Sequence, residues 1–299
     1  MPATRWMIAA ATLFCQFAGT AKLQAEPPVA ALMKLHTQEA ESYKIYRDKG
    51  RTEQLELQTK SIFNWTNLAG DHTQFGHIFI WTFQGRPEAI GTMFSTRASD
   101  FKQTHKRTLI HEFHTLSTAK LFPDTVQRNA YQWTPEKGIA LAVAEGAPAV
   151  ADSSTKRISQ MRALARLFEA EKHNADGKTW ELRLLPTPLW HYTPASDDVI
   201  EGAIFALVSS EGTDPEVLLL IEARHPANDV KTWAWHTAAL RFSDKDLTVK
   251  YNGKVLWSSL DDVAHRAEIR NSYTLIQVPD KTYMCYSARE IDELPDATP

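Results

Sequence analysis

The stretch that decides the fold runs from Gly202 to Ile221 and reads GAIFALVSSEGTDPEVLLLI. Two apolar runs flank a turn in which Gly212 permits a positive φ and Pro215 ends strand pairing. The second run, which starts at Val217, is apolar at every position, and this pattern predicts a strand covered on both faces. The sequence therefore predicts a buried antiparallel hairpin.

Two further hairpins are predicted on either side of this one. Residues 76–94 place the turn Gly85-Arg86-Pro87 between apolar runs. Near the other end, Asn252-Gly253 separates two strand-like runs, and Asn-Gly is the strongest short hairpin signal. Antiparallel pairing is therefore expected along most of the chain.

The first two hairpins belong to longer segments that resemble each other at spacings of about 122 to 127 residues. The matched groups are Leu55-Glu56-Leu57 with Trp180-Glu181-Leu182, Trp65 with Trp190, Gly76 with Gly202, Gly85 with Gly212, and His114-Thr115 with His236-Thr237. Their common order predicts an internal duplication. Short gapped matches between strand-rich segments also arise by chance, and that alternative stays open.

Each segment begins with a helical pattern of apolar residues. One pattern starts at Leu32 and runs past Tyr43 toward Asp48-Lys49-Gly50, and the other runs from Ile158 to Phe168. The expected fold is α+β, with two related units that each pack a helix on an antiparallel β-meander. That order is similar to cystatin-like and NTF2-like folds, an architectural likeness that implies no activity.

The proposed units are separated by a segment typical of a linker. Residues 144–155 are small, carry Gly, Pro and Ser, and lack amphipathic periodicity. The first unit is predicted over residues 26–143 and the second over 156–286. Residues 287–299 are acidic and contain two prolines, which predicts a disordered tail.

Residues 1–25 have the order typical of a secretory signal peptide. Arg5 precedes an apolar run that is too short to cross a bilayer, and the segment ends in Leu23-Gln24-Ala25. Cys15 lies inside the run, so a lipid anchor is not expected, and the alternative of a buried helix lacks a polar face. The sequence predicts an exported protein, either periplasmic or at the cell surface.

Composition limits the partners of the expected mature chain. Without the leader, Cys285 is the only cysteine, so no intramolecular disulfide can form. The net charge of −3 gives no basic footprint for nucleic acid. No later segment is apolar enough to span a membrane, and no cofactor motif is present. We expect a small-molecule, glycan or protein partner.

Several phrases resemble an uncharacterised family of exported bacterial proteins. They are Gly85-Arg86-Pro87-Glu88, His111-Glu112-Phe113-His114, the run from Gln160 to Ala165, the run from Trp180 to Pro186, and the run from Thr213 to Leu219. The resemblance covers roughly residues 55–257. It implies export and a two-part architecture, and it transfers no activity or site residues.

The group His111-Glu112-Phe113-His114 contains metal-ligand residue types in an unsuitable pattern. It is one residue short of the His-Glu-x-x-His spacing that places both imidazoles on one helix face. Its neighbours favour a strand, where an odd separation directs the two rings to opposite sides. We expect no metal, with one histidine facing solvent and the other hydrogen-bonded beside the core.

Two functions are expected from the remaining residues. The first is a non-catalytic binding or structural role, with His114, His236, Trp65 and Trp190 as candidate ligand contacts. Tryptophan is also favoured in strands for packing alone. The alternative is a hydrolase of cell-envelope or extracellular material, using histidine or carboxylate acid–base groups. The carboxylates considered for it are Glu88, Glu112, Glu181 and Glu216.

Overall fold

The computed structural model describes residues 29–67, 74–96, 106–125, 132–174, 177–196, 198–210, 212–225, 232–260, 275–278 and 280–292. Within them the chain forms two helices and nineteen strands. The predicted leader, residues 1–25, lies outside the described residues.

The first large sheet is antiparallel, with the order β18-β19-β6-β5-β4-β2, and β3 also pairs with β4. Its strands are β2 (Glu56–Leu57), β3 (Phe63–Asn67), β4 (Gln74–Phe83), β5 (Arg86–Thr96), β6 (Lys106–Thr115), β18 (Leu275–Gln277) and β19 (Tyr283–Asp292). Phe83 pairs with Arg86, so β4 and β5 are joined by the two-residue turn Gln84-Gly85, in which both residues have positive φ.

The second large sheet is also antiparallel, with the order β11-β13-β14-β15-β8, and β12 pairs with β13. Its strands are β8 (Ala142–Val143), β11 (Arg183–Leu184), β12 (Trp190–Tyr192), β13 (Val199–Val208), β14 (Pro215–Arg224) and β15 (Ala234–Arg241). Residues 217–221 of β14 are fully buried and alternate between two apolar cores. The predicted strand covered on both faces is confirmed.

Two smaller antiparallel sheets complete the strands. One has the order β10-β9-β16-β17 and the other pairs β1 with β7. The strands are β1 (Tyr43–Tyr46), β7 (Phe122–Thr125), β9 (Phe168–His173), β10 (Thr179–Glu181), β16 (Asp246–Tyr251) and β17 (Lys254–Ser258). Asn252 and Gly253 both have positive φ in the turn between β16 and β17, which confirms that hairpin prediction.

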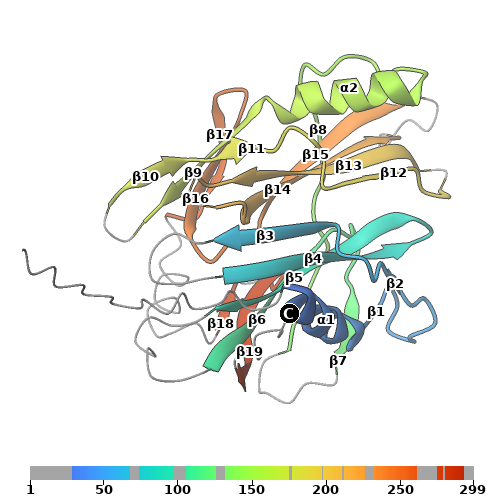
Figure 1. Ribbon diagram of the computed structural model, residues 1–299. Coiled ribbons are helices and arrows are strands. Elements are labelled where there is room, and N and C mark those ends of the chain that lie inside the picture. Colours follow the sequence, from blue (N-terminus) through green and yellow to red (C-terminus); the bar gives the residue numbers. More distant parts are fainter. Residues whose placement is uncertain are drawn as a thin grey trace, which may run out of the picture.

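The two large sheets pack face to face, and one apolar core lies between them. Ile80 and Ile90 of the first sheet share this core with Leu218 and Leu220 of the second. Helix α1 (Val29–Glu41) covers the outer face of the first sheet, while α2 (Ser154–Ala165) and the β9–β16 sheet cover the outer face of the second (Figure 1).

The predicted α+β class is therefore wrong. The described chain is mostly β, with several antiparallel sheets and two short helices, and it is not a pair of helix-on-meander units. The reason lies in the hairpins, because each large sheet has apolar side chains on both faces and packs one of those faces on the other sheet.

Both predicted helices end earlier than the apolar pattern suggested. Helix α1 stops at Glu41, and Tyr43 to Tyr46 form β1. Helix α2 stops at Ala165, and Phe168 begins β9. An aromatic residue three positions after the last helical apolar residue fits a buried strand position equally well, so periodicity alone could not locate either helix end.

The C-terminal strands pair with the first sheet, whereas the sequence placed residues up to 286 in the second unit. Strand β19 pairs with β6 and continues to Asp292, so residues 287–292 are not part of a disordered tail. Ile291 is buried between exposed acidic neighbours. Acidic composition concealed this alternation, and residues 293–299 lie outside the described residues.

The two hairpins contact the opposite sheet in a reciprocal way. Gly85, in the β4–β5 turn, lies against the backbone of Thr193 and Pro194, which follow β12. Gly212, in the β13–β14 turn, lies against Thr66 and Asn67 at the end of β3. The contact is closer at Gly212, where a Cβ would stand 2.8 Å from the Thr66 carbonyl oxygen. Each turn thus contacts the end of a strand in the other sheet, β12 in one case and β3 in the other.

Candidate functional site

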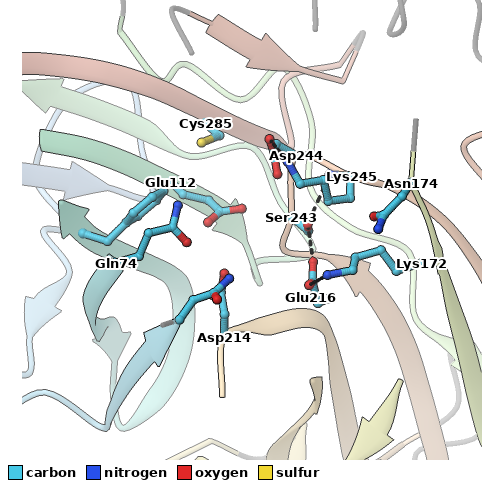
Figure 2. Close-up of a pocket in the computed structure, with 12 residues that line it drawn as sticks. Gln74, Glu112, Lys172, Asn174, Asp214, Glu216, Ser243, Asp244, Lys245 and Cys285 are labelled. Carbon is cyan, nitrogen blue, oxygen red and sulfur yellow. Dashed lines mark hydrogen bonds and ion pairs between the residues drawn. The ribbon is translucent and has the colours of Figure 1, made fainter. Parts of the chain in front are cut away.

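A polar cavity of about 260 Å³ opens between the two large sheets, near the start of β14. Side chains from both sheets and from β9 line it (Figure 2). The charged and hydroxyl groups that the chemistry uses are Glu112, Lys172, Asp214, Glu216, Ser243 and Asp244.

Glu216 is the most firmly held carboxylate of the cavity. Lys172 Nζ lies 2.9 Å from Glu216 Oε1, and the Ser243 hydroxyl donates to Glu216 Oε2. All three side chains are buried. Both oxygens of Glu216 therefore have partners, and its charge is balanced by Lys172.

The loop after β15 is fixed by a buried arginine. Arg241 donates from Nε to the carbonyl of Ser243 at 2.6 Å and from Nη2 to the carbonyl of Lys245 at 2.5 Å. Asp244 Oδ2 lies 2.9 Å from Lys245 Nζ. Burial opposes ionisation of Asp244, but Lys245 and Arg241 outweigh it and lower the pKa of this carboxyl.

Glu112 extends from the middle of β6 into the same cavity. Its Oε1 accepts a 2.7 Å hydrogen bond from the hydroxyl of Tyr283 on β19. Burial raises the pKa of Glu112 to about 8, the Tyr283 bond opposes that rise, and the charges of Asp244 and Glu216 add to it. Glu112 is therefore mainly a neutral carboxylic acid at pH 7.

Asp214 is the least supported acidic group of the cavity. Within the described residues, its side chain makes no hydrogen bond or ion pair. Burial, followed by the charges of Glu216 and Glu112, raises its pKa well above the ordinary value. In Figure 2 the carboxyl groups of Asp214, Glu112 and Glu216 surround one space.

The opposite ends of β5 and β14 carry a different polar cluster, in which the charged side chains pair with one another. Arg86 Nε lies 2.9 Å from Glu222 Oε1, and Arg86 Nη1 lies 3.0 Å from Glu88 Oε1. Tyr192 donates to Glu222 Oε1 at 2.5 Å, and Arg224 lies 3.0 Å from Glu222 Oε2. We call this cluster the closed end and the cavity the open end.

The closed and open ends occupy matching positions in the two sheets. The amide of Leu116 donates to the carbonyl of Glu88 at 2.7 Å, and the amide of Phe242 donates to that of Glu216 at 2.9 Å. Arg86 stands two residues before Glu88, as Asp214 stands two residues before Glu216. Asp214, an acid with a short side chain, thus stands at the open end in the position that Arg86, a base with a long side chain, has at the closed end.

The position of Glu222, the ion-pair partner of Arg86, also carries a different residue at the open end. Glu222 lies six residues after Glu216, and Phe94 lies six residues after Glu88. Phe94 lines the cavity and packs against Trp65 with ring centroids 5.2 Å apart. The buried Arg86–Glu222 pair of the closed end is therefore replaced by Asp214 and Phe94 at the open end.

Residues 111–114 form part of β6, so the predicted strand is confirmed, and His111 and His114 point to opposite faces. Both histidines are buried, which contradicts the expectation that one faces solvent. His111 Nδ1 contacts the Tyr43 hydroxyl at 2.5 Å beneath α1. Among the described residues, no group of three His, Cys, Asp or Glu side chains is arranged to hold a metal ion.

A second histidine contact lies under α1. His36 Nδ1 and His77 Nδ1 are 2.6 Å apart, and both side chains are buried. Burial lowers the pKa of His77 to about 4 and lowers that of His36 as well. This neutral pair packs α1 on the first sheet.

The four predicted ligand contacts are not brought together at the cavity, since none of them lines it. Trp65 is buried over Gly76 and donates to Thr92 Oγ1 at 3.0 Å. Trp190 is half-buried on β12. His114 Nδ1 contacts the Thr115 carbonyl at 2.7 Å, and His236 Nδ1 contacts that of Ala234 at 3.2 Å.

The predicted equivalence of His114 and His236 in the two sheets does not agree with the strand registers. His114 pairs with Ile90, whereas His236 pairs with Glu222. The residue that matches Trp65 in the second sheet is Tyr192, because Tyr192 covers Gly202 as Trp65 covers Gly76.

Sequence reasoning named two carboxylates of the cavity, Glu112 and Glu216, as acid–base candidates. It missed Lys172, Asp214 and the Ser243-Asp244-Lys245 loop. The available signal was charge at strand ends, because the turns before β14 and after β15 are both acidic and adjacent antiparallel strands bring such ends together.

No family model matches this chain, and no curated protein or solved structure is significantly similar to it. Among the described residues, neither helix is long and apolar enough to cross a membrane.

Proposed function

We propose that this chain is an exported binding protein whose small polar ligand occupies the cavity between the two large sheets. The single observation that carries the proposal is the state of Asp214, an acidic group in a polar cavity without a hydrogen-bonding partner among the described residues. Titratable groups whose pKa is shifted by burial and by neighbouring charges concentrate at functional sites. Export rests on the pattern of residues 1–25 alone.

We further infer that the binding protein arose by internal duplication. Support comes from the reciprocal turns, since Gly85 and Gly212 are 127 residues apart, as are Trp65 and Tyr192. The matching amide bonds to Glu88 and Glu216 add to this support. On this interpretation, one of two equivalent ends has lost its buried ion pair and become the ligand site.

A hydrolase is the second candidate, because the cavity contains one carboxyl group that is mainly neutral and another that is ion-paired. Glu112 is mainly neutral at pH 7 and Glu216 is paired as a carboxylate, an arrangement typical of a general acid and a base. Lys172 and Ser243 occupy both oxygens of Glu216, however, and compete with a substrate water for them. This geometry favours binding over catalysis.

The binding proposal is tested by screening small polar compounds against the full chain by thermal shift. Hits are then titrated into wild type and Asn174→Trp, because Asn174 lines the cavity and a bulky ring there obstructs it. Lys178→Trp is the matched control, since Lys178 is exposed in the same β9–β10 turn and does not line the cavity.

We expect compounds that bind wild type and Lys178→Trp but not Asn174→Trp. Equal binding to both variants, or a screen without hits, contradicts the proposal. Hydrolysis of nitrophenyl glycosides or esters that Glu112→Gln abolishes would favour the second candidate instead.

A further inference from the structure

The closed end indicates which chemical group fits the open end. At the closed end, the Arg86 guanidinium lies between the carboxylates of Glu88 and Glu222 and also donates to the carbonyls of Pro87 and Leu116. The open end has the same strand positions but no arginine, because Asp214 stands in the place of Arg86. A cation is therefore the occupant that would restore a positive charge among Glu112, Asp214 and Glu216, while Phe94 stands at the position that matches Glu222.

The charges of the open end also favour a cation. Lys172 is paired with Glu216, and Lys245 is paired with Asp244. Within the described ranges, neither Glu112 nor Asp214 has a lysine or arginine at ion-pair distance. The acidic groups that lack a basic partner therefore outnumber the basic groups that lack an acidic one.

An anionic ligand is disfavoured by the same inventory. It would lie beside the carboxylates of Glu216 and Asp244, and both lysines already have acidic partners. A neutral ligand could accept hydrogen bonds from the protonated carboxyls, but it would gain no ion pair when they ionise.

We propose that the open end binds an organic cation carrying a guanidinium or ammonium group, which pairs with the carboxyl groups of Glu112 and Asp214. This inference rests on the proposed binding function and names its ligand class. Phe94 closes one side of the site with an apolar ring, which suits the aliphatic part of such a compound.

Binding of such a cation is coupled to proton release. Glu112 enters the reaction mainly as a carboxylic acid, its proton leaves to the buffer, and the resulting carboxylate pairs with the ligand. The groups around Glu112 that influence this step are Tyr283 and Cys285 on β19, Arg241 on β15, Asp244 after β15, and Asp214 and Glu216 at the start of β14. Affinity for a cation should therefore rise as pH increases toward 8.

The test uses three probes of similar length that differ in charge: n-butylguanidine, its neutral isostere n-butylurea, and the anion pentanoate. Each is titrated calorimetrically into the full chain at pH 6, 7 and 8. Repeating the titration in phosphate and in Tris measures the protons released, because these buffers differ in ionisation enthalpy.

We expect only n-butylguanidine to bind, with proton release at pH 7 and with an affinity that increases between pH 6 and 8. Glu112→Gln and Asp214→Asn should each weaken its binding about tenfold or more, as expected for loss of a charged hydrogen bond. Glu171→Gln is the control, since that carboxylate pairs with Lys250 and does not line the cavity.

Glu112→Gln is informative because it replaces a mainly neutral acid by a neutral amide of the same shape, so lost binding is not explained by unfolding. Equal or stronger binding of n-butylurea or pentanoate, sensitive to Asn174→Trp, overturns the cation inference and leaves the binding function standing. Absence of binding by all three probes also overturns it, and the compound screen then decides the binding function separately.

Discussion

The closed and open ends of the inter-sheet layer differ in how their acidic side chains are paired. At the closed end, Glu222 is fully buried and its charge is balanced by Arg86 and Arg224. At the open end, Asp214 has no partner among the described residues and Glu112 is held mainly neutral by burial. Among the described residues, one polar cluster is fully paired, and the other contains a carboxyl group, that of Asp214, without a hydrogen bond or ion pair.

The difference teaches how stability and function separate within one fold. Breaking a complete buried cluster leaves an uncompensated charge, which strongly destabilises a protein. Removing a carboxyl that burial holds neutral, as at Glu112, removes the free energy that keeps it protonated at pH 7. Substitutions at the two ends should therefore have opposite effects on the free energy of unfolding.

The largest effect is expected at the closed end. Arg86→Met should lower the free energy of unfolding by about 3 to 5 kcal/mol, because Glu88 is left buried without an ion-pair partner and Glu222 keeps only Arg224. Urea denaturation at pH 7 measures this loss. Adding Glu88→Gln should recover part of it, since a neutral amide replaces the unpaired charge.

Lys250→Met serves as a control for loss of an ion pair in general. It breaks the half-buried Lys250–Glu171 contact and should leave the unfolding midpoint close to that of wild type. If Arg86→Met is as mild as this control, the closed end is not a stabilising cluster and the comparison fails.

The next effect has the opposite sign and depends on pH. The folded-state pKa of Glu112 is raised to about 8 from an ordinary value of 4.5, so the folded chain binds more protons than the unfolded chain between these values. Wild-type stability therefore falls as pH rises from about 4.5 to about 8. Glu112→Gln removes this loss and should be more stable than wild type by about 2 to 3 kcal/mol at pH 7.

Urea denaturation of wild type and Glu112→Gln at pH 4, 7 and 8.5 measures the difference. The two proteins should converge at pH 4, where the carboxyl is protonated in both the folded and the unfolded wild type. A Glu112→Gln variant that is less stable than wild type at every pH would show that Glu112 belongs to a structural cluster.

The smallest effect is expected from a substitution that makes the open end resemble the closed end. Asp214→Arg places a guanidinium at the position that matches Arg86, beside the carboxyls of Glu112 and Glu216. We expect a gain of about 1 to 2 kcal/mol in the free energy of unfolding, together with loss of ligand binding. Thermal denaturation and titration with n-butylguanidine measure both. A destabilised variant that still binds the probe would show that the two positions are not equivalent.

Local features of the fold were predictable from sequence because they depend on neighbouring residues. The Asn252-Gly253 turn and the doubly covered strand at residues 217–221 follow from turn chemistry and apolar pattern. The packing of the sheets was not predictable in the same way. Alternation shows that a face is buried, but it does not show what buries it.

The candidate site illustrates the same limit. Glu112 could be named as an acid–base candidate from sequence, but its environment comes from Tyr283 and from the loop at Ser243. Asp214 carried no distinguishing mark, because an aspartate before a turn proline is common. Asp214 becomes notable only by comparison with the β4–β5 turn, where the matching position carries Arg86.

The pairing of β19 with β6 also governs when this site can exist. Tyr283 and Glu112 are separated by 171 residues, and Cys285 reaches the cavity from the same late strand. Contacts of such long sequence separation form slowly and require almost the whole chain. A ribosome that still holds residues 283–285 therefore holds a chain without a finished cavity, and any activity of the cavity must wait until β19 has been synthesised and has paired with β6.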